Sequence, residues 1–137
     1  MARSADIIGD RVVLLILREA FYGVHRFDDM LQDLNTPKSV LTDRLKRMIS
    51  HGLLERFEYR EDGARKRFAY RLTKKGRALA PVIVAIKEWG EGFELDAPSS
   101  IGIQHKENGK WLRLLPVDSD GSAVDWADVA LAKRNSE

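Results

Sequence analysis

The chain has 137 residues and no cysteine, which excludes disulfide bonds, thiolate zinc sites and thiol redox sensing. It also lacks any apolar run near the roughly 18 residues that a membrane-spanning helix needs. Asp6 and Asp10 interrupt the apolar N-terminal segment, so it does not resemble a signal peptide. With 44% hydrophobic and 32% charged residues, the composition is that of a soluble globular protein, for which we expect a cytoplasmic location.

Residues that could catalyse a reaction or bind a metal are few and dispersed. The three histidines share no spacing that suits a metal site or a catalytic dyad, and there is no glycine-rich phosphate loop. One acidic cluster consists of Asp118, Asp120, Asp125 and Asp128. The twelfth position counted from Asp118 is Val129, not the bidentate glutamate of an EF-hand loop, so we interpret the cluster as a solvated turn. We predict no enzymatic activity, metal or cofactor.

The net charge of +2 conceals an uneven distribution. Residues 1–93 hold 18 Lys+Arg against 13 Asp+Glu, whereas residues 94–137 hold 5 against 8. Residues 36–77 alone hold 13 against 5, a net charge of +8. A compact basic segment is expected of a protein that binds a polyanion, although charge alone does not distinguish it from a solvated surface.

Three helices are expected in the first 52 residues. Residues 4–22 predict a strongly apolar helix, and its apolar positions wrap more than one face, which suggests burial against a second surface as well as its own domain. The segment "RFDDMLQDL", residues 26–34, predicts a short second helix. Residues 36–52 predict a third, with Thr36 as N-cap, Pro37 at the first helical position and a glycine at the end.

The third helix has one apolar and one polar side. Leu41, Leu45 and Met48 form a single apolar stripe, and the opposite side is basic and rich in hydroxyls. Two helices joined by a tight turn, the second with such an outer face, form a helix-turn-helix pattern. The residues predicted to contact DNA from this recognition helix are Lys38, Ser39, Thr42, Asp43, Arg44 and Lys46. Arg44 lies nearer the apolar edge, so we expect it to pair with an acid or a phosphate.

A basic hairpin is predicted next. "LLERFEY" and "KRFAYRL" alternate in the manner of strands, and Asp62-Gly63 between them is a turn signal. A basic hairpin directly after the second helix of a helix-turn-helix pair is a wing. The residues predicted to contact DNA from the wing and nearby backbone are Arg26, Arg60, Arg65, Lys66 and Arg67.

Residues 72–93 return to helical spacing. A terminal apolar helix beside an over-apolar first helix suggests a dimer seam, although both could serve only the intramolecular core. The predicted dimer residues are Ile7, Ile8, Leu15, Val82, Ile86 and Trp89. Four aromatic residues could instead line a pocket for a small aromatic effector, namely Phe21, Tyr22, Trp89 and Phe93. We favour dimer core over pocket for these aromatics.

The tail is predicted as a separate extension, residues 94–137, attached to a domain of residues 1–93. "APSS" is a plausible linker, and Asn108-Gly109 is a strong turn signal for a hairpin over residues 101–117. Residues 118–135 predict a further turn and a last strand.

Residues 5–93 resemble the HxlR family of bacterial winged-helix transcriptional regulators and, more distantly, the MarR type. The motifs that carry the resemblance, in register, are "IIGDRVVLLILREA", "RFDDMLQDL", "SVLTDRLKRMISHGLLER" and "YRLTKKGRALAPVIVAIKEWG". The resemblance implies a homodimer with two recognition helices and with wings on the DNA backbone. The chain departs from the family in having Val12 where an aromatic is usual and in lacking an N-terminal sensing cysteine, which removes thiol chemistry as the signal.

The sequence therefore predicts an α+β fold, a mainly helical winged helix-turn-helix with a two-stranded wing and a small C-terminal β appendage. Similar appendages in the family hold zinc with cysteine pairs, which this chain lacks. The predicted function is that of a homodimeric, sequence-specific DNA-binding regulator, a repressor acting on an inverted-repeat operator, with a non-thiol effector conceivable. The alternative is a winged-helix protein-interaction module that does not bind DNA. The basic wing and polar helix face favour DNA.

Overall fold

The computed structural model describes residues 1–61, 63, 65–97 and 102–132. It contains two compact units, Met1–Ile86 and Lys87–Glu137, each described here by itself. The boundary between them falls inside helix α6 (Ala80–Phe93), and the division expected after residue 93 stays a prediction. No helix in the described ranges has the length and hydropathy to cross a membrane.

The apolar N-terminal segment forms two helices where one was expected. Helix α1 (Ala2–Ile8) ends at Gly9, and α2 (Arg11–Phe21) begins after Asp10. The Asp10 carboxylate accepts hydrogen bonds from the amides of the first turn of α2, which starts a new helix. An added Cβ at Gly9 would lie 2.5 Å from a backbone oxygen of α1, so only glycine fits this elbow. The prediction of one helix over residues 4–22 was therefore wrong.

The helix-turn-helix pair consists of α3 (Phe27–Leu34) and α4 (Lys38–Ser50), joined at Asn35 in the left-handed conformation (φ 43°). The predicted cap on α4 was wrong. Pro37, with an extended ψ of 138°, is itself the N-cap, and no side chain caps this helix. Proline and threonine thus lie one position further from the helix than the capping pattern suggested.

The core lies between α2, α3, α4 and the base of the hairpin. The predicted apolar stripe of α4 is confirmed, because Leu41, Leu45 and Met48 are all buried. They pack in one cluster with buried residues of the other elements, chiefly Val13, Ile16, Leu17, Met30, Leu34, Leu54, Tyr70 and Leu72. The core thereby fixes which side of α4 faces outward.

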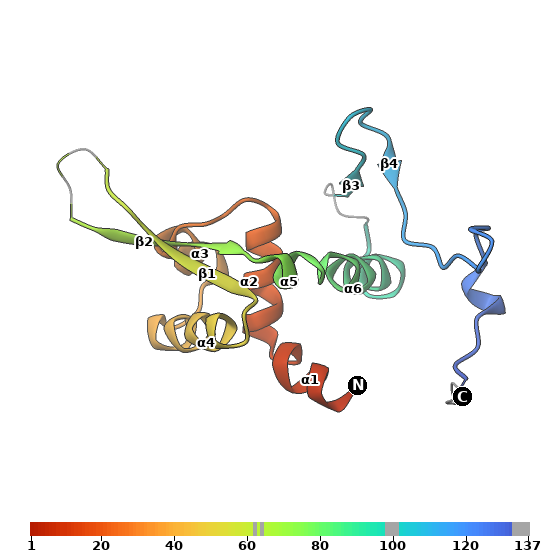
Figure 1. Ribbon diagram of the computed structural model, residues 1–137, viewed down its shortest axis with the longest axis horizontal. Coiled ribbons are helices and arrows are strands. Elements are labelled where there is room, and N and C mark those ends of the chain that lie inside the picture. Colours follow the sequence, from red (N-terminus) through yellow and green to blue (C-terminus); the bar gives the residue numbers. More distant parts are fainter. Residues whose placement is uncertain (62, 64, 98–101, 133–137) are drawn as a thin grey trace. The chain divides into compact units, whose positions relative to one another are not determined.

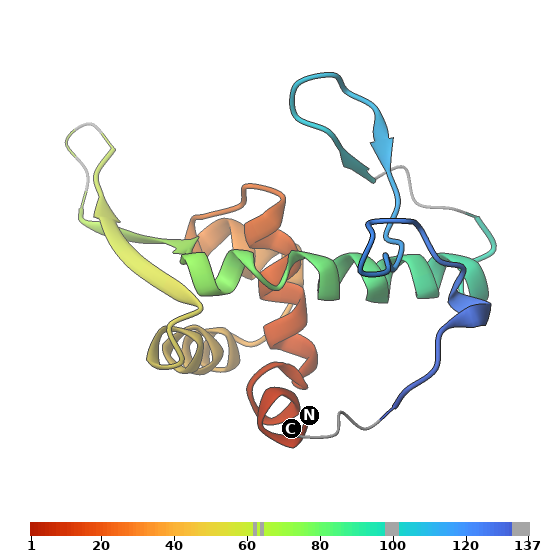
Figure 2. The same ribbon diagram turned by 45° about the vertical axis from the view of Figure 1, so that its right-hand side comes forward.

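The predicted wing is confirmed as an antiparallel hairpin of β1 (Leu54–Tyr59) and β2 (Arg67–Leu72). It projects away from the helices α2, α3 and α4 in both views (Figures 1 and 2). An isolated bridge joins Arg26 to Ala69 of β2, and the Tyr70 amide donates to the His25 carbonyl at 2.8 Å. The segment before α3 therefore anchors the wing beside the helix-turn-helix pair.

Two helices also replace the single helix expected after the wing. Thr73 caps the short α5 (Lys74–Arg77) by accepting from the Gly76 amide at 3.0 Å, and α6 then begins at Ala80. Pro81 is the second residue of α6, where its missing amide is not needed.

Gly76 packs so closely that we expect Gly76→Ala to destabilise the fold. A Cβ there would lie 2.1 Å from the Leu53 carbonyl oxygen, a backbone atom that cannot rotate away. The free energy of unfolding should fall by about 1–3 kcal/mol in urea denaturation, the usual cost of overpacking. Gly90→Ala is the matched control, because a Cβ at Gly90 meets nothing within 4 Å. Inside α6 it should stabilise by about 0.5–1 kcal/mol, and equal effects of the two would contradict this.

The second unit contains the predicted hairpin, with β3 (Ile103–Gln104) paired to β4 (Trp111–Leu112) and Gly109 at a φ of 67°. Beyond it, the described residues through 132 hold an isolated bridge and a 3₁₀ helix, η1 (Trp126–Asp128), so the predicted last strand is absent from them. Residues 133–135 of that prediction lie outside the described residues. Carboxylates of the acidic cluster accept hydrogen bonds from backbone amides. The Ser122 amide, for example, donates to Asp118 Oδ1 at 2.9 Å.

Candidate nucleic-acid interface

The outer face of α4 gathers five of the six residues predicted for the recognition helix. They line one open hollow of about 530 Å³, and they are Lys38, Ser39, Thr42, Asp43 and Lys46. Four of the five are exposed, and Thr42 is half-buried. The buried stripe on the opposite side of α4 produces this arrangement, since it directs these positions to the solvent. The face combines cationic, hydroxyl and carboxylate groups suited to phosphates and base edges.

The Thr42 hydroxyl is already committed as a donor. Its Oγ1 donates to the Lys38 carbonyl at 2.8 Å, one turn earlier in α4. Toward a ligand, the side chain therefore offers a lone pair and its methyl group but no proton.

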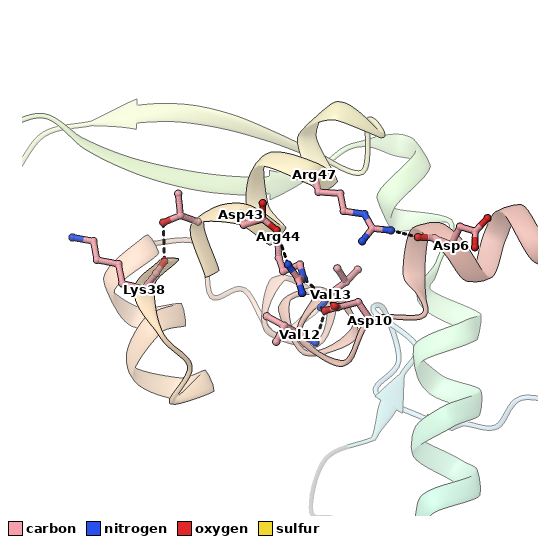
Figure 3. A network of polar contacts seen from close by, with 9 residues as sticks. Asp6, Asp10, Val12, Val13, Lys38, Asp43, Arg44 and Arg47 are labelled. Atoms are coloured by element: carbon pink, nitrogen blue, oxygen red, sulfur yellow. Dashed lines mark hydrogen bonds and ion pairs between the residues drawn. The ribbon is translucent and has the colours of Figure 1, made fainter. Parts of the chain in front are cut away.

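Arg44, the sixth predicted residue, pairs with acids. Its Nε lies 2.9 Å from Asp10 Oδ2, and its Nη1 lies 2.5 Å from Asp43 Oδ2 (Figure 3). One turn along α4, the Arg47 guanidinium donates to the backbone carbonyl of Asp6 in α1 (Figure 3). The expectation that Arg44 pairs with an acid is thus confirmed, and α4 is tied to the elbow between α1 and α2.

Asp10 and Arg44 shift each other's pKa values. Burial raises the pKa of the Asp10 carboxyl, but hydrogen bonds from the Val13 amide, the Arg44 guanidinium and the Val12 amide outweigh burial and hold the pKa below its ordinary value. Hydrogen bonds to Asp10 and Asp43 raise the pKa of Arg44. Both groups are therefore charged at neutral pH, and the pair persists there.

We expect the fold to lose stability on acidification in part through Asp10. Because the pKa of Asp10 is lower in the folded state, the ionised carboxylate stabilises the fold at pH values above the unfolded-state pKa, which is about 4. This stabilisation is lost as the pH falls through the folded pKa. In urea denaturation between pH 7 and pH 3, Asp10→Asn should lose less stability below about pH 4 than the wild type.

Glu58→Gln is the positive control for this measurement. A hydrogen bond from Lys66 also lowers the pKa of Glu58, so this variant should lose less stability in acid as well. The double variant should therefore show a flatter acid limb than either single variant. Identical acid limbs for Asp10→Asn and the wild type would contradict the role given to Asp10.

The five cations predicted to contact DNA from the wing and to contact its backbone are not equivalent. Three of them are paired: Arg26 with Glu61 at 2.5 Å, Lys66 with Glu58 at 3.0 Å and Arg67 with Asp28 at 3.6 Å. Toward the described residues, Arg60 and Arg65 form no ion pair, and both are exposed. These two arginines are therefore the wing cations best placed to meet a phosphate without first breaking a pair.

The predicted dimer residues separate into two groups. Ile7, Ile8 and Leu15 are half-buried and pack against the core of their own chain. Val82, Ile86 and Trp89 lie on one stripe of α6 with Phe93, and their exposed fractions range from 37% to 77%. Of the predicted dimer residues, those on α6 are therefore the ones that expose apolar surface.

The aromatics of the predicted effector pocket differ in their surroundings. Phe21 packs against the core, and Tyr22 is 47% exposed. The Trp89 and Phe93 rings pair with their centroids 6.2 Å apart. The two described hollows are lined by other residues, so the pocket stays a prediction.

Sequence reasoning missed the tie between Asp10 and α4. The available signal was local: an acid after glycine and directly before an apolar helical run is a helix N-cap pattern. The partner could not be identified, because Arg44 lies 34 residues later. The links from Arg26 to Glu61 and from Arg67 to Asp28 were missed for the same reason, whereas Lys66 and Glu58 are only eight residues apart in the same hairpin.

Comparison with known proteins identifies the family. The profile of the HxlR-like helix-turn-helix family matches residues 7–97. The HTH-type transcriptional regulator Rv3095 of Mycobacterium tuberculosis, itself uncharacterised, is 40% identical over 93 residues, which is 68% of this chain and 58% of Rv3095. This chain thus spans little more than half the length of that relative.

Two solved structures extend the similarity over almost the whole chain. The crystal structure of PA1607, a candidate transcription factor, is 33% identical with a TM-score of 0.80, and the match covers 97% of this chain and 93% of PA1607. PA1374 of Pseudomonas aeruginosa, also a candidate transcription factor, is 28% identical with a TM-score of 0.66, over 99% and 92% of the two chains. The chain belongs to the HxlR-like helix-turn-helix family, which is a family of transcriptional regulators and not of enzymes.

Proposed function

We propose that the protein is a sequence-specific DNA-binding transcriptional regulator that acts as a homodimeric repressor on an inverted-repeat operator. The observation that carries the proposal is the outer face of α4, where five polar and charged side chains line one hollow. The relatives' description as HTH-type transcriptional regulators supports the same function. Since operators are chromosomal, we place this activity in the cytoplasm.

The N-terminal half of α4 is the part suited to enter the major groove. Recognition helices usually contact base edges with their N-terminal residues. Lys38 and Ser39 lie in the first turn, where the positive end of the helix dipole favours a phosphate. Thr42 and Asp43 follow about one turn later and line the same hollow, so we assign them to contacts with bases. Lys46, one turn beyond, is positioned for a guanine or a phosphate.

A protein-interaction module is the weaker alternative. Such a module would be expected to expose apolar side chains on α4, because apolar and aromatic residues are enriched at interface cores. The apolar residues of α4 instead form the buried stripe. Most of the exposed large apolar residues lie instead on α6 and in the C-terminal extension. The exposed stripe on α6 supports self-association through that helix, which leaves α4 for DNA.

The structure supports the proposed homodimer more directly than the proposed effector. Exposed Val82, Ile86 and Trp89 support a dimer seam on α6. A two-fold dimer would present two recognition helices about 34 Å apart, so half-site centres should lie about 10 bp apart or a multiple of that. A small aromatic effector is proposed only as a ligand to test, in a thermal-shift screen of aromatic acids, phenols and quinones.

Retention on duplex DNA with a salt titration tests the function and makes a prediction for the wing. Arg60→Ala combined with Arg65→Ala should weaken binding to specific and nonspecific DNA alike, because phosphate contacts carry no sequence information. The slope of log affinity against log salt should become shallower by about 0.9 for each lost phosphate contact.

Lys106→Ala combined with Lys110→Ala is the matched control for net charge. Both lysines are exposed and belong to the C-terminal extension, outside the wing, α4 and α6. An equal change of slope in this control would mean that net charge, and not the wing, sets the salt dependence. Failure of the wild type to retain any duplex would refute the proposed function.

A further inference from the structure

Arg44 lies between two carboxylates that belong to different parts of the fold. Asp43 is its neighbour on α4, with a side chain that is 67% exposed, and Asp10 is the N-cap of α2. The Arg44 side chain itself is only 28% exposed. One guanidinium thus joins the outer face of the recognition helix to the first turn of another helix (Figure 3).

Both oxygens of the Asp10 carboxylate accept hydrogen bonds. Its Oδ1 accepts from the Val12 amide at 2.9 Å and the Val13 amide at 3.1 Å, while its Oδ2 accepts from Arg44 Nε at 2.9 Å. Two backbone amides hold Oδ1 at the start of α2, which leaves Oδ2 to accept from Arg44. Arg44 therefore has a rigid anchor on the side away from Asp43.

The geometry leaves one oxygen of Asp43 for a ligand. Arg44 Nη1 occupies Asp43 Oδ2 at 2.5 Å, and no other described residue bonds to this carboxylate. The second oxygen can accept a hydrogen bond from a base amine, such as N4 of cytosine. Arg44 also offsets the charge of Asp43, which would otherwise repel the phosphates on either side of the groove.

A second tie restrains the same helix. Arg47, three positions after Arg44 and on the same side of α4, donates to the Asp6 carbonyl in α1. Helix α1 and the N-cap of α2 therefore hold α4 at two successive turns. Both ties lie on the side of α4 that faces the protein, not on the residues that line its hollow.

We propose that Asp10 is a remote determinant of operator preference: it anchors Arg44, and Arg44 orients the Asp43 carboxylate toward a base. Arg44 is a positioning residue that does not contact phosphate, contrary to its place among the predicted DNA contacts. The inference rests on the proposed function, since it concerns how the same face of α4 recognises DNA.

Binding-site selection with four proteins tests the proposal: the wild type, Asp43→Asn, Arg44→Lys and Asp10→Ser. Serine still caps α2 but cannot reach Arg44, and lysine keeps the charge but cannot span two carboxylates. All three variants should relax the preference at the same symmetric pair of positions. We expect roughly ten-fold lost discrimination for Asp43→Asn, as for one base contact, and a smaller loss for the other two. The salt slope should stay unchanged in every variant.

Asp33→Ser removes the same charge from an exposed position of α3 and is the control; it should leave the preference intact. A uniform loss of affinity in Asp10→Ser, with the sequence preference intact and a lowered melting temperature, would overturn the proposal in favour of a purely structural role. A shallower salt slope in a fifth protein, Arg44→Gln, which removes the charge, would overturn it in favour of a phosphate contact. A wild type without sequence preference would refute the proposed function as well, whereas an intact preference in Asp10→Ser refutes only this inference.

Discussion

Trp89→Glu combined with Ile86→Glu should convert the protein from a dimer to a monomer and abolish operator binding at physiological salt. The two side chains are 58% and 48% exposed on the α6 stripe, so a single chain tolerates the change, whereas a seam would have to desolvate the new charges. A monomer would bind one half-site alone. The loss of the linked second half-site should lower the apparent affinity by a factor of about 100 or more.

Sedimentation velocity at micromolar concentration checks the assembly. The wild type should sediment at about twice 15.6 kDa, and the variant at about 15.6 kDa. Gln104→Glu, which adds a negative charge at an exposed position of β3, is the control and should remain dimeric. A wild type that sediments as a monomer would remove the dimer and, with it, the expectation of an inverted-repeat operator.

Local patterns were enough to predict the winged helix. The i, i+4, i+7 spacing of Leu41, Leu45 and Met48 predicted the side of α4 that is buried, because burial and helical period are linked directly. Alternation and a glycine turn likewise predicted β1 and β2. Where the prediction failed, at the elbow before α2, the apolar period continues through a glycine and an acid whose capping role interrupts the helix.

The chemistry of the interface was less accessible, because it depends on pairing across the fold. From sequence, the four wing cations and Arg26 look alike, yet three of these five are paired with Glu61, Glu58 and Asp28. Glu61, for example, lies 35 residues after Arg26 in the sequence, and no local sequence rule pairs residues that far apart. Which cations remain for DNA is therefore a property of the tertiary structure.

In the C-terminal extension, by contrast, the local turn could be predicted but the described residues form no core around it. Its turn chemistry at Asn108-Gly109 was predictable, and the hairpin formed as expected. Among residues 102–132, however, none is buried, and Trp111 and Trp126 are 66% and 58% exposed. Local hydrogen bonds, such as those on Asp118 and Asp125, therefore determine its conformation more than a core does.

Thr42→Ala should relax the operator preference at one symmetric pair of positions. The Thr42 hydroxyl proton is donated to the Lys38 carbonyl, so Thr42 can meet a base only through a lone pair or its methyl group. A thymine methyl suits the methyl group, and an adenine or cytosine amine suits the lone pair. Losing the contact should cost about 1–3 kcal/mol per half-site on the preferred sequence.

Two further variants separate these contacts. Thr42→Val keeps a methyl and removes the lone pair, whereas Thr42→Ser keeps the lone pair and removes the methyl. If the methyl meets thymine, preference should survive in Thr42→Val and be lost in Thr42→Ser, and the reverse result would indicate an amine donor. Each protein is compared by binding-site selection and by affinity for the preferred duplex.

Ser50→Ala is the matched control, because the Ser50 hydroxyl donates to the Arg47 carbonyl at 2.7 Å at the other end of the same helix. It removes the same kind of side-chain hydrogen bond from α4 without touching the hollow. Its preference and affinity should equal those of the wild type, so any loss in Thr42→Ala beyond the control comes from contact with DNA. Uniform weakening with the preference intact would assign Thr42 to the DNA backbone. An unchanged preference and affinity would mean that this face of α4 does not read the operator.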